Sequence, residues 1–168
     1  MFTHCIILYK TDPEIEPEFI VVAVEIRVMT SVLVPFDGSK LAVEALEFAY
    51  ERFPEAEVTA LFVVDTSVTY QPEKYVGVKL GEIYEQREKE GEAILEEAEV
   101  VAAAFDAPLT TAVEQGRPWQ EILDYVDDHG VDHVVLGSHS RDLLERFFVG
   151  SVAERVVDRI PVPVTLIR

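Results

Sequence analysis

The chain has 168 residues, the size of one domain, and 49% of them are apolar, which is enough for a packed core. It contains 14 Lys and Arg and 32 Asp and Glu, which gives a formal net charge of −18. This charge argues against a general affinity for nucleic acid or anionic membranes, since both need a basic surface. The single cysteine, Cys5, excludes a disulfide framework and a cysteine-based metal site.

Neither a membrane span nor a secretion signal is recognisable. No stretch approaches the roughly 18 apolar residues of a spanning helix, and the apolar run Phe19–Val24 lacks the basic residues that precede a signal core. The sequence therefore predicts a cytoplasmic protein. Its acidity also favours adaptation to a salt-rich cytoplasm, where ions screen the repulsion between carboxylates.

Residues 1–28 differ from the rest of the chain. Pro13 and Pro17 interrupt regular structure between an apolar patch, Cys5–Tyr9, and a strand expected within Phe19–Val28. One interpretation is an appended strand or arm. The other is a gene-prediction artefact upstream of a true start at Met29. We therefore divide the chain into an N-terminal extension, 1–28, and a domain, 29–168.

From Ser31 onwards, short apolar runs alternate with segments of helical periodicity. The strands are expected at 32–35, 58–64, 109–113, 131–136 and 162–167. The helices are expected from the N-cap Ser39 to Pro54, from Leu80 to Phe105, from Pro118 to Gly130, and from Ser151 to Arg159. A turn is expected at 114–118, and loops at 66–81 and 137–149.

This strict alternation predicts an α/β fold with an open five-stranded parallel sheet and helices on both faces. In such a sheet, ligands bind at the carboxyl ends of the strands where the winding direction reverses. The rule points to three segments: 35–39, 63–65 and 137–151.

Two of these positions suit a phosphate. Gly137 ends the fourth strand, and a glycine there lets a ligand approach the backbone closely. Gly150 and Ser151 open the last helix and offer free N–H groups, a hydroxyl and the positive end of the helix dipole. Each such contact contributes about 0.3–1 kcal/mol, so several must converge. For either position alone, a turn glycine or a helix cap is the simpler interpretation.

Taken together, these motifs resemble the universal stress protein family over about residues 30 to 168. The family's nucleotide motif is a glycine, two residues, a glycine, nine residues, then glycine with serine or threonine. Here Gly137, Gly150 and Ser151 match it in place. The segments 32–39, 62–65, 116–118 and 161–164 are also similar to the family's.

The resemblance implies a Rossmann-like fold of the adenine nucleotide alpha hydrolase type, with ATP, accompanied by Mg²⁺, as the ligand. Asp37 and the Val63 backbone would meet the adenine, although Asp37 also suits the turn before the first helix. The glycines and Ser151 would meet the ribose and phosphates. The implied nucleotide-binding residues are Pro35, Asp37, Val63, Leu136, Gly137, Ser140, Gly150, Ser151 and Val152.

The chain departs from the family at Ser140, which stands where the motif has its second glycine. If that position needs a positive φ, serine costs roughly 1–2 kcal/mol more than glycine. A cost of about 1.4 kcal/mol is tenfold in affinity. Ser140 is therefore expected to weaken ATP binding without abolishing it, unless its Cβ meets the phosphate.

The expected function is a nucleotide-binding regulatory module of the stress response without efficient catalysis. The sequence has no P-loop, nucleophile elbow or metal-ligand cluster, and no catalytic residue is assigned. The alternative is a dimeric stress protein that binds no nucleotide and acts through protein contacts. A nucleotidyl-transferring relative is disfavoured, because the His-x-Gly-His signature is absent. The resemblance also implies a homodimer through the last strand.

Overall fold

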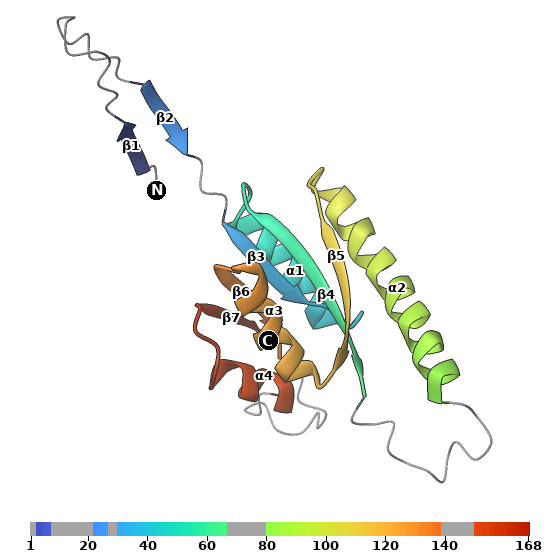
Figure 1. Ribbon diagram of the computed structural model, residues 1–168. Helices are drawn as coiled ribbons and strands as arrows, with labels where there is room; N and C mark the ends of the chain where they lie inside the picture. The colour runs from blue at the N-terminus through green and yellow to red at the C-terminus, as the bar shows by residue number, and fades with distance from the viewer. Residues whose placement is uncertain (1–2, 8–21, 27–29, 67–79, 139–149) are drawn as a thin grey trace, which may run out of the picture.

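The computed structural model describes residues 3–7, 22–26, 30–66, 80–138 and 150–168. Its elements in chain order are β1 (Thr3–Ile7), β2 (Val22–Ile26), β3 (Ser31–Pro35), α1 (Lys40–Arg52), β4 (Glu57–Asp65), α2 (Leu80–Ala104), β5 (Thr110–Gly116), α3 (Pro118–His129), β6 (His133–Gly137), α4 (Ser151–Val157) and β7 (Val164–Ile167) (Figure 1). From β3 onwards, strands and helices alternate as predicted. None of the helices in these residues is both long and apolar enough to cross a membrane.

Strands β3 to β7 form one parallel sheet in the order β5-β4-β3-β6-β7. The chain winds outward from β3 through β4 to β5, then returns to the other side of β3 to form β6 and β7. The predicted α/β fold with a five-stranded parallel sheet is confirmed. The winding direction reverses between β3 and β6.

The sheet separates two hydrophobic cores. Val32 and Val34 of β3 belong to the α1/α2 core, together with side chains of α1 and α2, whereas Leu33 belongs to the α3/α4 core. Successive residues of a strand point to opposite faces, so each strand serves both cores. All three residues are fully buried, which explains why the strand is a continuous apolar run.

Strand β5 differs from the prediction. A turn was expected at 114–118, but β5 continues to Gly116 because Glu114, Gln115 and Gly116 pair with the last residues of β4. These polar residues pair through their backbones at the edge of the sheet, so the strand continues without an apolar side-chain pattern. The other element ends differ from the predicted ones by only a few residues.

The N-terminal extension contains β1 and β2, which pair antiparallel as a separate two-stranded sheet from Thr3↔Ile26 to Ile7↔Val22. Strand β2 lies within the strand expected at 19–28. Both interpretations of residues 1–28 remain predictions.

Candidate functional site

The carboxyl ends of β3 and β6 lie side by side at the reversal point. The register pairs Leu33 with Val134, so the strands end at the same sheet edge, at Pro35 and Gly137. The chain leaves β3 for α1 on one face, whereas α4 packs on the other. In open α/β sheets, this divergence marks the ligand-binding edge.

Asp37 lies in a tight turn between β3 and α1. Its Oδ1 accepts a hydrogen bond from the Ser39 N–H at 3.0 Å, while the side chain stays exposed. Gly38 has φ +73°, which glycine adopts without strain. The turn-closing role of Asp37 is therefore present in the structure, and its role toward adenine remains a prediction.

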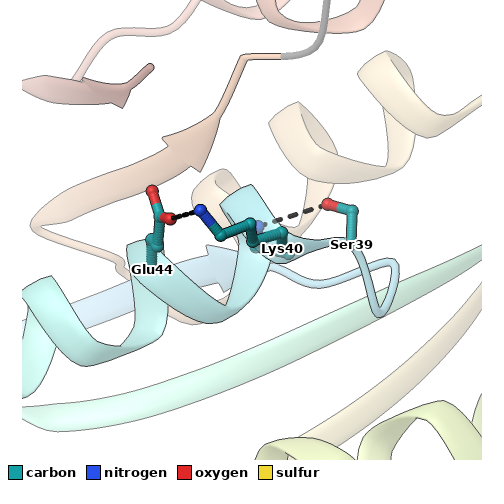
Figure 2. A network of polar contacts seen from close by, with 4 residues as sticks. Ser39, Lys40 and Glu44 are labelled. Carbon is teal, nitrogen blue, oxygen red and sulfur yellow. Dashed lines mark hydrogen bonds and ion pairs between the residues drawn. The ribbon is translucent and has the colours of Figure 1, made fainter.

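Ser39 fixes the start of α1. Its hydroxyl accepts a hydrogen bond from the Ala42 N–H at 3.2 Å, as predicted for an N-cap (Figure 2). One turn along the helix, Lys40 Nζ lies 3.0 Å from Glu44 Oε1. The cap engages the hydroxyl of Ser39 at the first turn of α1.

Val63 lies where β4 extends beyond the end of β3. The Leu61 carbonyl accepts a hydrogen bond from the Phe36 N–H at 2.8 Å, so the backbone groups of Leu61 face β3. Backbone groups alternate sides along a strand, so those of Val63, two residues further, face the same side. The paired part of β3 ends at Pro35, opposite Leu61. The backbone of Val63 is thus directed toward the switch-point edge.

Gly137 has a packing role that the sequence did not predict. A Cβ at this position would lie 2.8 Å from the carbonyl carbon of Leu41 and 2.9 Å from its oxygen. The glycine therefore lets the first turn of α1 approach the end of β6. Leu136 before it is buried, and the Ser138 N–H after it donates to the Ile167 carbonyl at 2.9 Å.

Gly150, Ser151 and Val152 form the start of α4. Gly150 is the N-cap and gives α4 no side-chain cap, and Ser151 is exposed. Val152 packs on the α3/α4 core, which also includes Leu136 and contacts Val63. Apart from Ser140, the predicted residues thus lie at or just beyond the carboxyl ends of β3, β4 and β6 or at the start of α4, and their roles toward a nucleotide remain predictions. Ser140 lies outside the described residues, so its role remains a prediction.

A carboxylate lies near the neighbouring strand ends. Glu121, in the first turn of α3, packs against Gly116, where a Cβ would collide with its side chain. Burial raises the pKa of Glu121, and the nearby Asp124 and Glu114 raise it further. No group of three or more potential metal ligands occurs among the described residues.

A contact between α3 and α4 was not predicted from the sequence. The guanidinium carbons of Arg155 and Arg159 lie 5.9 and 5.4 Å from the centre of the Trp119 ring. Trp119 is the only tryptophan in the chain. Nothing in the sequence pattern pairs these residues, because the contact depends on how α3 and α4 pack.

The sheet order defines a doubly wound α/β protein, and the candidate residues lie around its switch point. The universal stress protein family model matches residues 29–168, so the chain belongs to this family. Universal stress protein MJ0531 of Methanocaldococcus jannaschii is 31% identical to it, over 82% of this chain and 81% of the relative. YxiE of Bacillus subtilis is 33% identical, over 81% of this chain and 97% of the relative.

The same fold recurs in solved structures. UspA from Lactobacillus plantarum is 33% identical, with a TM-score of 0.66, over 83% of this chain and 97% of UspA. More distant neighbours of the same fold are a universal stress protein in complex with cAMP, one from Arabidopsis thaliana with AMP bound, and one from Archaeoglobus fulgidus in complex with dAMP.

Proposed function

We propose that this protein binds an adenine nucleotide, ATP with Mg²⁺, at the switch-point edge between β3 and β6. We propose that it acts in the cytoplasm as a regulatory module of the stress response. One observation carries the proposal: the backbone N–H and C=O groups of Val63 face the switch-point edge, beside the turn that contains Asp37. The adenine nucleotides bound by universal stress proteins of the same fold support it.

The two ends of the ligand would meet different chemistry. The Asp37 carboxylate accepts hydrogen bonds, and the Val63 backbone offers one donor and one acceptor, which suits the edge of adenine. At the other end, the Gly150 and Ser151 N–H groups suit phosphate oxygens. Each contact with the helix dipole contributes about 0.3–1 kcal/mol, so the affinity depends on several contacts acting together.

We propose regulation rather than efficient turnover because the described side chains of the site offer few groups for proton transfer. Asp37 is the one titratable residue among those assigned to the site, and its Oδ1 is engaged in the turn before α1. A general base must reach the proton that it removes. We place Asp37 at the adenine end, away from the phosphates.

A calorimetric titration with ATP and Mg²⁺ tests the proposal. We expect a dissociation constant below about 1 mM, which corresponds to roughly −4 kcal/mol. Asp37→Ala should weaken ATP binding about tenfold, a loss typical of one hydrogen bond to a charged group.

Ser39→Ala is the matched control, because it removes another hydrogen bond of the same turn. It should cost about 1 kcal/mol of stability, as the loss of a helix cap does, with ATP affinity unchanged within twofold. The absence of heat at sub-millimolar ATP would refute the proposed function. Equal losses of affinity in the two variants would remove the role of Asp37.

Ser140 favours the alternative, a dimer that acts through protein contacts without a nucleotide. The structure does not describe this residue, and serine replaces the family glycine there. A Ser140→Gly variant separates the two functions: it should bind ATP more tightly if the position needs glycine. For either function, we propose a homodimer through β7, whose outer backbone edge has no partner strand in the described sheet.

A further inference from the structure

Helix α4 depends on tertiary contacts for its position. It has seven residues, and helices this short are not stable alone in water. Its buried side consists of Ala153 and Val156, which are 3% and 0% exposed. These two small side chains, with the partly buried Val152 beside them, hold the helix on the sheet. Small apolar side chains resist sliding along the helix axis only weakly, so a further contact would help to fix α4 in that direction.

Trp119, in the first turn of α3, supplies that contact. Arg155 lies in α4, and Arg159 comes four residues later, two residues beyond the last residue of the helix. Their guanidinium carbons lie 5.9 and 5.4 Å from the centre of the Trp119 ring, within the usual range of a cation–π interaction. One ring therefore contacts an arginine of α4 and a second arginine just beyond the end of the helix.

The two arginines are also joined to each other. Arg159 follows the end of α4, and its Nη1 donates a hydrogen bond to the Arg155 carbonyl at 3.1 Å. Glu154 and Asp158 are exposed neighbours in sequence, yet within the described ranges neither guanidinium forms an ion pair with a carboxylate. Within the described residues, the side-chain group that contacts both guanidinium groups is the Trp119 ring.

The indole N–H of Trp119 adds no described contact to this arrangement. Trp119 Nε1 is buried and finds no acceptor among the residues that the structure describes. A buried donor without a partner destabilises the fold. Among the described residues, the favourable contacts of Trp119 therefore come from its ring, and phenylalanine would retain a ring while removing the N–H donor.

We propose that Trp119, Arg155 and Arg159 form an aromatic clamp that positions α4 and thereby sets Gly150 and Ser151 at the nucleotide site. These three are positioning residues and do not themselves touch the nucleotide. The inference rests on the proposed function for its effect on ATP. Its effect on α4 can be measured without a ligand.

The first test is hydrogen exchange of the ligand-free, full-length protein. Trp119→Leu should speed amide exchange in α4 at least about fivefold, with little change in α1. Trp119→Phe should leave exchange near the wild-type rate, since it keeps the ring. The double variant R155M/R159M should repeat the Trp119→Leu result. Both arginines are exposed, so this variant remains informative if Trp119→Leu fails to fold.

The second test is titration with ATP and with adenosine, which lacks the phosphates. Loss of the clamp should weaken ATP binding about tenfold and leave adenosine binding within twofold. Phe105→Leu is the control. It breaks the Tyr50–Phe105 stack on the α1/α2 side, where the ring centres are 5.4 Å apart, and should leave both affinities unchanged.

The outcomes separate the clamp from the proposed function. If the wild-type protein binds neither ligand, the proposed function fails, and hydrogen exchange still decides whether the clamp exists. If α4 exchanges at the wild-type rate in folded Trp119→Leu and R155M/R159M, the clamp is wrong. Equal losses of ATP and adenosine affinity would show a general defect of the site and refute the positioning role.

Discussion

Gly137 and Gly130 are both glycines for structural reasons, but the reasons differ. At Gly137, the backbone of Leu41 occupies the space of a side chain. At Gly130, none of the described residues comes within 4 Å of the place that a Cβ would take, but φ is +62° as the chain leaves α3. The first position is limited by packing and the second by backbone conformation.

These reasons predict different responses to substitution. Gly137→Ala should cost about 1–3 kcal/mol, as overpacking does, because the helix backbone of Leu41 cannot move aside cheaply. Gly130→Ala should cost about 1–2 kcal/mol from left-handed strain alone. Urea unfolding measures both losses.

Asparagine distinguishes the two mechanisms, because it tolerates the left-handed conformation but is larger than alanine. Gly130→Asn should recover stability relative to Gly130→Ala, whereas Gly137→Asn should lose more than Gly137→Ala. The opposite order at either glycine would contradict its assigned cause.

Strands β6 and β7 are joined by a side-chain contact as well as by their backbones. His133 Nε2 lies 2.9 Å from Thr165 Oγ1, and the His133 ring lies 4.8 Å from that of Phe53. Burial lowers the pKa of His133. This burial therefore favours the neutral form of His133.

The sign of the pH dependence follows from this shift. Between the lowered pKa of the folded state and the ordinary value of about 6.5, the unfolded chain binds more protons. Stability should therefore rise with pH through this window, level off above about 6.5, and be lost as the pH falls. Urea unfolding at pH 7.5 and 5.5 should show a larger loss for the wild type than for His133→Gln. Equal losses would show that His133 does not contribute.

The buried elements were predictable from sequence, because their signals are local. Continuous apolar runs predicted β3, β4 and β6, and Ser39, Pro118 and Gly130 predicted helix ends that the structure confirms. The end of β5 was not predictable, since polar residues extend it through backbone pairing.

The candidate site was predictable in part. The alternation of elements predicted a parallel sheet, and the general rule for such sheets pointed to the carboxyl ends of its strands. The strand order was not predicted and comes from the structure. The packing role of Gly137 and the aromatic clamp arise from contacts between segments far apart in sequence. No local pattern contains such contacts.

The proposed homodimer is a property of the whole molecule. The outer edge of β7 would expose unpaired backbone groups in a monomer, and pairing with a second copy would cover them. Light scattering should give a mass about twice the chain mass of 18.9 kDa, with dissociation on dilution. A constant mass of one chain at all concentrations would refute the dimer.

The sheet separates two hydrophobic cores, so substitutions in one core should affect stability independently of substitutions in the other. Substitutions in the α1/α2 core share few partners with those in the α3/α4 core, so their energies should add. Sequence drift in one half can thus accumulate without compensating changes in the other. Descendants of this chain can inherit one half intact while the opposite half diverges.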